Sequence, residues 1–143
     1  MIRRLAVLAI IALAFATQAN AVGTQTVTVA RIGSSLVRVT IAWTSDGSGN
    51  VSGNTITGFP AGKLEQVQFV PGTGGVAPDA NYDVTLADQY GVDLLVANGQ
   101  NLAAATSKQL LFSPASILDA QPVLTIAGAG AANSGTVIAW VRQ

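Results

Sequence analysis

Four aspartates that lie close together are the residues of this chain best suited to chemistry. Asp79, Asp83, Asp88 and Asp93 fall within residues 79–93. Paired carboxylates can act as the acid and nucleophile of a glycosidase, and carboxylate oxygens are also the ligands that Ca²⁺ prefers. Aspartates beside turns have a third role, because they accept hydrogen bonds from backbone N–H groups and so hold loops. We expect this loop-holding role for the stretch Asp79–Asp93, and calcium binding and catalysis stay open as alternatives.

Most other enzyme chemistries lack the side chains that they need. The chain contains neither histidine nor cysteine, which excludes Ser-His-Asp and Cys-His catalysis. A disulfide framework and a cysteine metal site are excluded in the same way. Lys63 and Lys108 leave a Ser-Lys pair formally open, but no feature marks a particular serine. The sequence therefore predicts a protein that is not an enzyme, with no catalytic, cofactor-binding or metal-binding residues and no cofactor.

Two glycine-containing segments and two tryptophans could belong to binding sites. The segment 46–50 (DGSGN) has the start of a calcium loop, but its glycine is misplaced and Thr57 stands where a bidentate Glu is required. We interpret it as a polar turn. The segment 72–75 is not followed by Lys-Ser/Thr, so it is not a phosphate loop. Trp43 and Trp140 lie among aliphatic residues, which predicts packing in the core or at a subunit interface; a sugar-stacking platform is the alternative.

The elements that position these residues are short strands. Apolar and polar residues alternate after Val22, which is typical of half-buried strands. We expect strands over residues 24–31, 36–44, 51–57, 64–70, 82–87, 92–96, 109–112, 123–127 and 136–141. The strands over 36–44 and 51–57 are expected to form a hairpin, and the strand over 109–112 is expected to end at Pro114. Residues 102–108 are rich in alanine and are the helix candidate of this part of the chain.

Short strands separated by turn residues predict an all-β fold. Their number and spacing are typical of a single-domain antiparallel β-sandwich with jelly-roll-like connections. We assign this domain to residues 22–143, a length that suits one hydrophobic core.

Residues 1–21 have the pattern of a targeting segment. Arg3 and Arg4 precede an apolar run over residues 5–15, and Ala19-Asn20-Ala21 provides the small residues required for cleavage before Val22. The run is short for a membrane span, which needs about 20 apolar residues. A cleaved signal peptide is the main interpretation. A retained anchoring helix, or a helix packed inside a larger assembly, is the alternative, and only retention would bring the protein to a membrane.

The composition favours a protein that packs against neighbours. Half of the residues are hydrophobic and only 10% are charged, which leaves neutral, apolar-rich surface for contact with other subunits. All seven acids follow Val22, whereas two of the seven basic residues belong to the leader. No basic run is present, so the electrostatic pattern of a nucleic-acid-binding protein is missing.

A longer pattern resembles a known group of proteins. Its centre is 81–95 (NYDVTLADQYGVDLL), followed by 98–102 (NGQNL). Upstream stand 43–46 (WTSD), 62–64 (GKL) and 69–72 (FVPG), and downstream 123–126 (VLTI) and 133–137 (NSGTV). In this order the segments resemble small virion-associated proteins encoded in the head and tail structural modules of tailed bacteriophages and prophages. The resemblance covers Leu36 to Arg142.

This resemblance implies a β-rich structural subunit of a virion, such as a capsid decoration protein or a head or tail accessory protein. It implies a symmetric homo-oligomer that contacts other virion proteins, such as the major capsid protein, and it implies no catalytic residues. The leader favours a second hypothesis, an exported β-sandwich binding module in the periplasm or outside the cell. Such a module would be adhesin-like or carbohydrate-binding.

Overall fold

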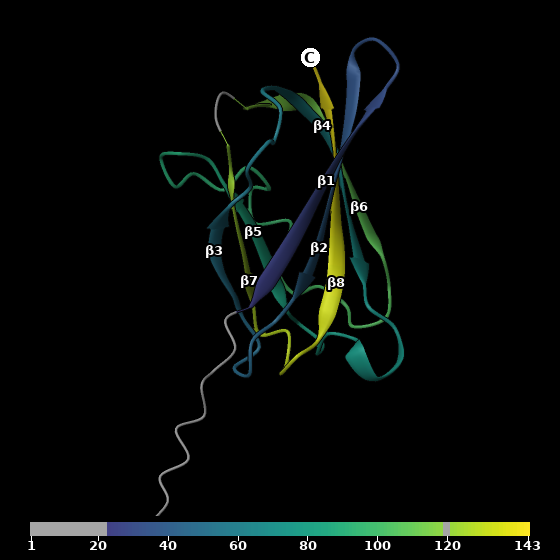
Figure 1. Ribbon diagram of the computed structural model, residues 1–143, viewed down its shortest axis with the longest axis vertical. Coiled ribbons are helices and arrows are strands. Elements are labelled where there is room, and N and C mark those ends of the chain that lie inside the picture. The colour runs from purple at the N-terminus through teal and green to yellow at the C-terminus, as the bar shows by residue number, and fades with distance from the viewer. Residues whose placement is uncertain (1–22, 119–120) are drawn as a thin grey trace, which may run out of the picture.

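The chain forms two antiparallel β-sheets that pack face to face (Figure 1). The computed structural model describes residues 23–118 and 121–143, without the side chains of residues 113–118. The five-stranded sheet has the order β1-β2-β8-β4-β6 and consists of β1 (Thr24–Ile32), β2 (Leu36–Thr44), β8 (Ser134–Arg142), β4 (Gly62–Pro71) and β6 (Lys108–Leu118). The three-stranded sheet has the order β3-β7-β5 and consists of β3 (Val51–Thr55), β7 (Val123–Ala127) and β5 (Asp83–Ala87). The predicted all-β, two-sheet fold is confirmed.

Alternation of side chains produces the core between the sheets. In β2 and β8 every second residue is buried, and the residues between them face outward, as the two-residue period of a strand requires. β5 and β7 repeat this pattern in the other sheet. The core is one cluster that draws on both sheets, with Val39, Ile41, Phe69, Leu86 and Ile126 among its buried members.

The strand pairings are nested. β2 pairs with β8, β3 pairs with β7, and β4 pairs with β6, all antiparallel. The chain therefore resembles one long hairpin folded over on itself, with its innermost connection between β5 and β6. Two further pairings, β4 with β8 and β5 with β7, join the folded halves within each sheet.

The prediction that residues 36–44 and 51–57 form a hairpin is wrong, because β2 and β3 belong to different sheets. The turn between them crosses from one sheet to the other. The buried Ser45 fastens this turn to the β7–β8 connection: its N–H donates to the Asn133 carbonyl (2.8 Å) and its hydroxyl donates to the Gly130 carbonyl (2.6 Å). These bonds direct the chain toward β7, which becomes the partner of β3.

Three further expectations about elements are wrong. Residues 102–108 form no helix, because Leu102 exchanges backbone hydrogen bonds with Asn81 and Tyr82 (both 2.9 Å). Residues 92–96 form turns instead of a strand, apart from a bridge between Asp93 and Ala87. β6 continues past Pro114, because that residue lies where the pairing with β4 breaks register, and a register break on an edge strand tolerates proline.

One short helical element is present in the described part of the chain, the 3₁₀ turn η1 (Gly74–Val76) after β4. None of the helices in residues 23–118 and 121–143 is long and apolar enough to cross a membrane. The expected leader, residues 1–21, lies outside the described residues.

Candidate functional site: the outer face of the five-stranded sheet

Three of the four aspartates of the stretch Asp79–Asp93 hold the loops in which they lie. Asp83 Oδ1 accepts a hydrogen bond from Asn101 N (2.8 Å), and Asp88 Oδ1 accepts from Tyr90 N (2.8 Å) and Val92 N (2.9 Å). Both carboxylate oxygens of Asp93 are used in the same way, by Leu95 N (3.0 Å) and Ala97 N (2.8 Å). The loop-holding role predicted from the sequence is confirmed for these three aspartates.

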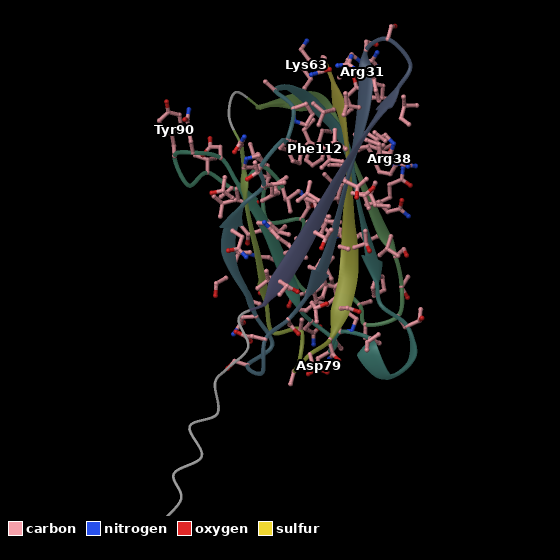
Figure 2. All side chains as sticks on the ribbon, in the orientation of Figure 1. Arg31, Arg38, Lys63, Asp79, Tyr90 and Phe112 are labelled. Carbon is pink, nitrogen blue, oxygen red and sulfur yellow. The ribbon has the colours of Figure 1, made fainter. Side chains whose placement is uncertain are left out.

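Asp79 lies apart from the other three aspartates. It is exposed and stands beside Gly130, at the end of the molecule opposite Lys63 and Arg31 (Figure 2). Its backbone N–H donates to the Ala129 carbonyl (2.9 Å). In residues 23–118 and 121–143, no group of three or more acidic side chains is arranged to hold a metal ion. Asp46 is also engaged in its own turn, because its Oδ1 accepts from Ser48 N and Asn50 N (both 2.8 Å). The polar-turn interpretation of residues 46–50 is confirmed.

The two tryptophans have different positions. Trp43 is buried, and its ring lies 5.8 Å from the ring of Tyr82, which directly precedes β5, with the two rings tilted by 46°. Burial also raises the pKa of Tyr82 to about 12, because the phenolate would lose its hydration. The core prediction is therefore confirmed for Trp43. Trp140 is half-buried and belongs to the outward-facing set of β8, between the buried Ala139 and Val141.

Trp140 is part of a broad surface that we call the outer face, the solvent side of the five-stranded sheet. Strand register aligns its residues in three neighbouring rows: Thr26, Ala42, Thr136 and Val70; Thr28, Thr40, Ile138, Gln68 and Gln109; Ala30, Arg38, Trp140, Gln66 and Leu111. Arg38 is the charged residue among them. The other members of the three rows are four threonines, three glutamines, two alanines and single valine, isoleucine, leucine and tryptophan residues, so these rows are low in charge for the exposed side of an antiparallel sheet, which is ordinarily polar.

The charges of the outer face gather at the end where β8 finishes. Arg142 and Glu65 form a bidentate pair there, from Nε to Oε1 and from Nη2 to Oε2, the latter over 2.9 Å. The hydrogen bond from Arg142 holds the pKa of Glu65 below its usual value, and the same bond raises the pKa of Arg142. Lys63 lies opposite Arg142 in the register. This charged end borders the row that contains Arg38 and Trp140, whereas the rows through Thr28 and Thr26 contain no charged residue.

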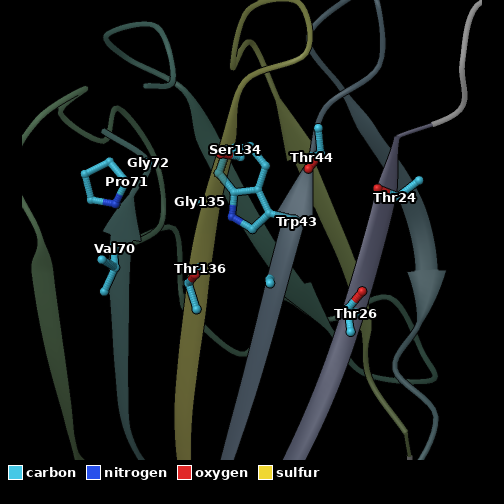
Figure 3. A pocket seen from close by; sticks show the side chains of 11 residues that line it. Thr24, Thr26, Trp43, Thr44, Val70, Pro71, Gly72, Ser134, Gly135 and Thr136 are labelled. Carbon is cyan, nitrogen blue, oxygen red and sulfur yellow. The ribbon is translucent and has the colours of Figure 1, made fainter. Parts of the chain in front are cut away.

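A shallow hollow of about 290 Å³ opens at the other end of the outer face (Figure 3). Hydroxyl groups of Thr24, Thr26, Thr44, Ser134 and Thr136 surround it, and Val70, Pro71 and the edge of Trp43 complete its wall. The small residues Ala42, Gly72 and Gly135 create the space.

Gly135 explains how Trp43 fits at this position. Trp43 and Gly135 are direct cross-strand neighbours. A Cβ placed on Gly135 would lie 2.6 Å from Cζ2 of Trp43 and 3.0 Å from the Val70 carbonyl oxygen. Glycine within a strand marks such close approaches, so the indole packs across the β8 backbone because residue 135 has no side chain.

Sequence reasoning did not single out the threonines of the outer face. The signal was present in the alternation of Thr24, Thr26 and Thr28, which places three hydroxyls on one side of a strand. The sequence does not show which side of β1 faces solvent, and it does not show that β2 and β8 continue the same face.

No family model matches this chain, and neither the curated proteins nor the solved structures contain a match.

Proposed function

We propose that this protein is a non-enzymatic structural protein of a phage virion, a capsid decoration or head/tail accessory subunit that assembles as a symmetric oligomer. In this role the outer face binds another virion protein, such as the major capsid protein. The observation that carries the proposal is the low charge of the three rows of the outer face, which include Trp140 and carry one charged residue, Arg38. The centres of protein–protein interfaces are depleted of charged residues and enriched in aromatic residues and arginine, and Trp140 with the neighbouring Arg38 fits that composition.

The connectivity supports the same role. Nested pairing of β2 with β8, β3 with β7 and β4 with β6 is the wrapping expected of a jelly roll, a fold used by viral capsid and lectin domains. The β5–β6 connection fills the place beside β5 where a jelly roll has a further strand, through the hydrogen bonds from Leu94 N to Leu86 O and from Val84 N to Gly99 O (both 2.8 Å). A fold by itself does not specify a function, so the outer face remains the main argument.

The experiment is mass spectrometry of virus particles purified by density gradient from the source culture. The diagnostic peptide ends at Arg31. We expect it in the particle fraction, extending upstream of Val22 if the leader is retained. Absence of the protein from particles contradicts the proposal.

Variants localise the contact. Trp140→Ser combined with Leu111→Ser removes two apolar side chains of the outer face and is expected to abolish association with particles. Val92→Ser combined with Tyr90→Ser is the matched control, because it removes two exposed apolar side chains from the β5–β6 connection instead. Circular dichroism confirms that each variant is folded. Equal loss of association in both pairs of variants would refute docking through the outer face.

The alternative function is an exported binding module, adhesin-like or carbohydrate-binding, in the periplasm or outside the cell. The hydroxyl-lined hollow favours it, because hydroxyl groups can hydrogen-bond to a sugar. This alternative predicts a soluble exported protein that begins at Val22 and binds on a glycan array. Thr44→Val should then weaken binding, whereas Thr57→Val, an exposed threonine outside the hollow, should not.

A further inference from the structure

Three of the four sheet edges are protected against pairing with another chain. β6 carries Pro114 at a break in its register with β4. β3 is five residues long, contains Gly53 and shifts register between Val51 and Asn54. The free side of β5 is covered by the β5–β6 connection through the Leu94–Leu86 and Val84–Gly99 hydrogen bonds. Proline, register shifts, short length and covering loops are the devices that prevent edge-to-edge association.

The fourth edge, β1, has no proline and no register shift, and it is longer than β3 and β5. It is nine residues long and pairs with β2 without a register shift from Thr24 opposite Thr44 to Ile32 opposite Leu36. Its sequence contains no proline or glycine, and its single charged residue, Arg31, stands next to the end of the strand, opposite Val37. Within residues 23–118 and 121–143, no strand pairs with the other side of β1. Every second residue of β1 therefore presents backbone N–H and C=O groups along an open edge.

Apolar side chains beside this edge are also uncovered. β1 begins next to β3, where Gln25 Nε2 donates to the Asn54 carbonyl (3.4 Å), and then runs diagonally away from the three-stranded sheet (Figure 1). Val29 points to the inner side of the sheet, opposite the buried Val39, yet is 46% exposed. Ile32 is 45% exposed at the end of the strand. A neighbouring strand would cover both.

We propose that the β1 edge binds the β1 edge of a second copy of this chain, antiparallel, around a two-fold axis at Thr28. The two five-stranded sheets then form one continuous sheet with their outer faces on the same side. Pairing centred on Thr28 uses the whole strand and sets Val27 opposite Val29 of the second copy and Gln25 opposite Arg31 of the second copy. No like charges face each other, and apolar cross-strand pairs stabilise such contacts. A two-fold contact of identical edges closes on itself, so assembly at this edge stops at two copies.

The self-association test uses the purified full chain in sedimentation velocity over a range of concentrations. The wild type is expected at twice the 14.5 kDa mass of one chain. Val29→Lys places a charge on the inner side of the edge and should raise the dimer dissociation constant about tenfold or more. Val76→Lys is the matched control, because Val76 is also 46% exposed but lies in η1; it should leave the dimer intact. A monomeric wild type, growth beyond two copies, or equal effects of both substitutions would overturn the proposal.

Cross-linking tests the position of the axis, and the absence of cysteine makes a single introduced thiol informative. Thr28→Cys should form a disulfide-linked dimer on mild oxidation, whereas Thr44→Cys, exposed one strand away from the edge, should not. Cross-linking of both variants to the same extent would refute the Thr28 axis. This inference deepens the oligomer of the proposed virion role, but both measurements use the isolated protein. A dimer that is missing from particles refutes the virion role alone, and a monomer found in particles refutes the β1 pairing alone.

Discussion

Replacing Gly135 with alanine is the sharpest test of the packing beneath the outer face. The new methyl group would lie 2.6 Å from Cζ2 and 2.8 Å from Cε2 of Trp43, and 3.0 Å from the Val70 carbonyl oxygen. All three distances are shorter than ordinary van der Waals contacts. Trp43 has little room to move away, because it is buried and its ring also packs against Tyr82.

The expected cost follows from two opposing effects. Overpacking of a core costs about 1–3 kcal/mol. Alanine also restricts the unfolded chain more than glycine does, which returns about 0.4–1 kcal/mol. The net loss in the free energy of unfolding should therefore be about 1–2 kcal/mol.

Urea denaturation followed by tryptophan fluorescence measures this loss. Gly75→Ala is the matched control, because an added Cβ there meets no atom within 4 Å; it should leave the stability unchanged or slightly higher. Trp43→Leu in the same experiment tests the cause, because Gly135→Ala should cost less than half as much when the indole is absent. The explanation fails if Gly135→Ala is as stable as the wild type, or if its cost does not depend on Trp43.

Three more predictions concern single side chains. Burial raises the pKa of Tyr82 to about 12 in the folded protein, so the unfolded chain releases this proton at a lower pH than the folded chain does. The free energy of unfolding should therefore be unaffected below pH 10 and fall by up to ~2.5 kcal/mol between pH 10 and 12. Tyr82→Phe should remove that fall in urea titrations across this range. Ser45→Ala leaves Gly130 O and Asn133 N without their side-chain partner and should cost ~2 kcal/mol in urea denaturation, whereas the exposed Ser48→Ala should cost little. Asp93→Ala removes two hydrogen bonds to backbone N–H groups and should lower the free energy of unfolding by about 1–2 kcal/mol. The melting temperature of the wild type should be the same in millimolar CaCl₂ and in EDTA. A higher melting temperature in CaCl₂ would contradict the purely loop-holding role of these aspartates.

The sequence by itself determined the strands that are buried on one side. β2, β5, β7 and β8 alternate between apolar and polar residues, and this alternation depends only on the two-residue period of an extended chain. The roles of Asp46, Asp88 and Asp93 could be predicted for a similar reason. Each bonds to backbone N–H groups two and four residues further on, so no distant part of the chain is needed.

The tertiary structure decided the pairing of these strands and the properties of their surfaces. β2 and β3 are neighbours in the sequence, yet the bonds of Ser45 to the β7–β8 connection send them to different sheets. Leu102 lies in an alanine-rich segment, yet its backbone bonds with Asn81 and Tyr82 prevent a helix. The outer face, its hollow and the open edge of β1 combine residues from strands far apart in the chain. Such features depend on which backbone groups find partners after folding, and that choice is made by long-range contacts rather than by local preference.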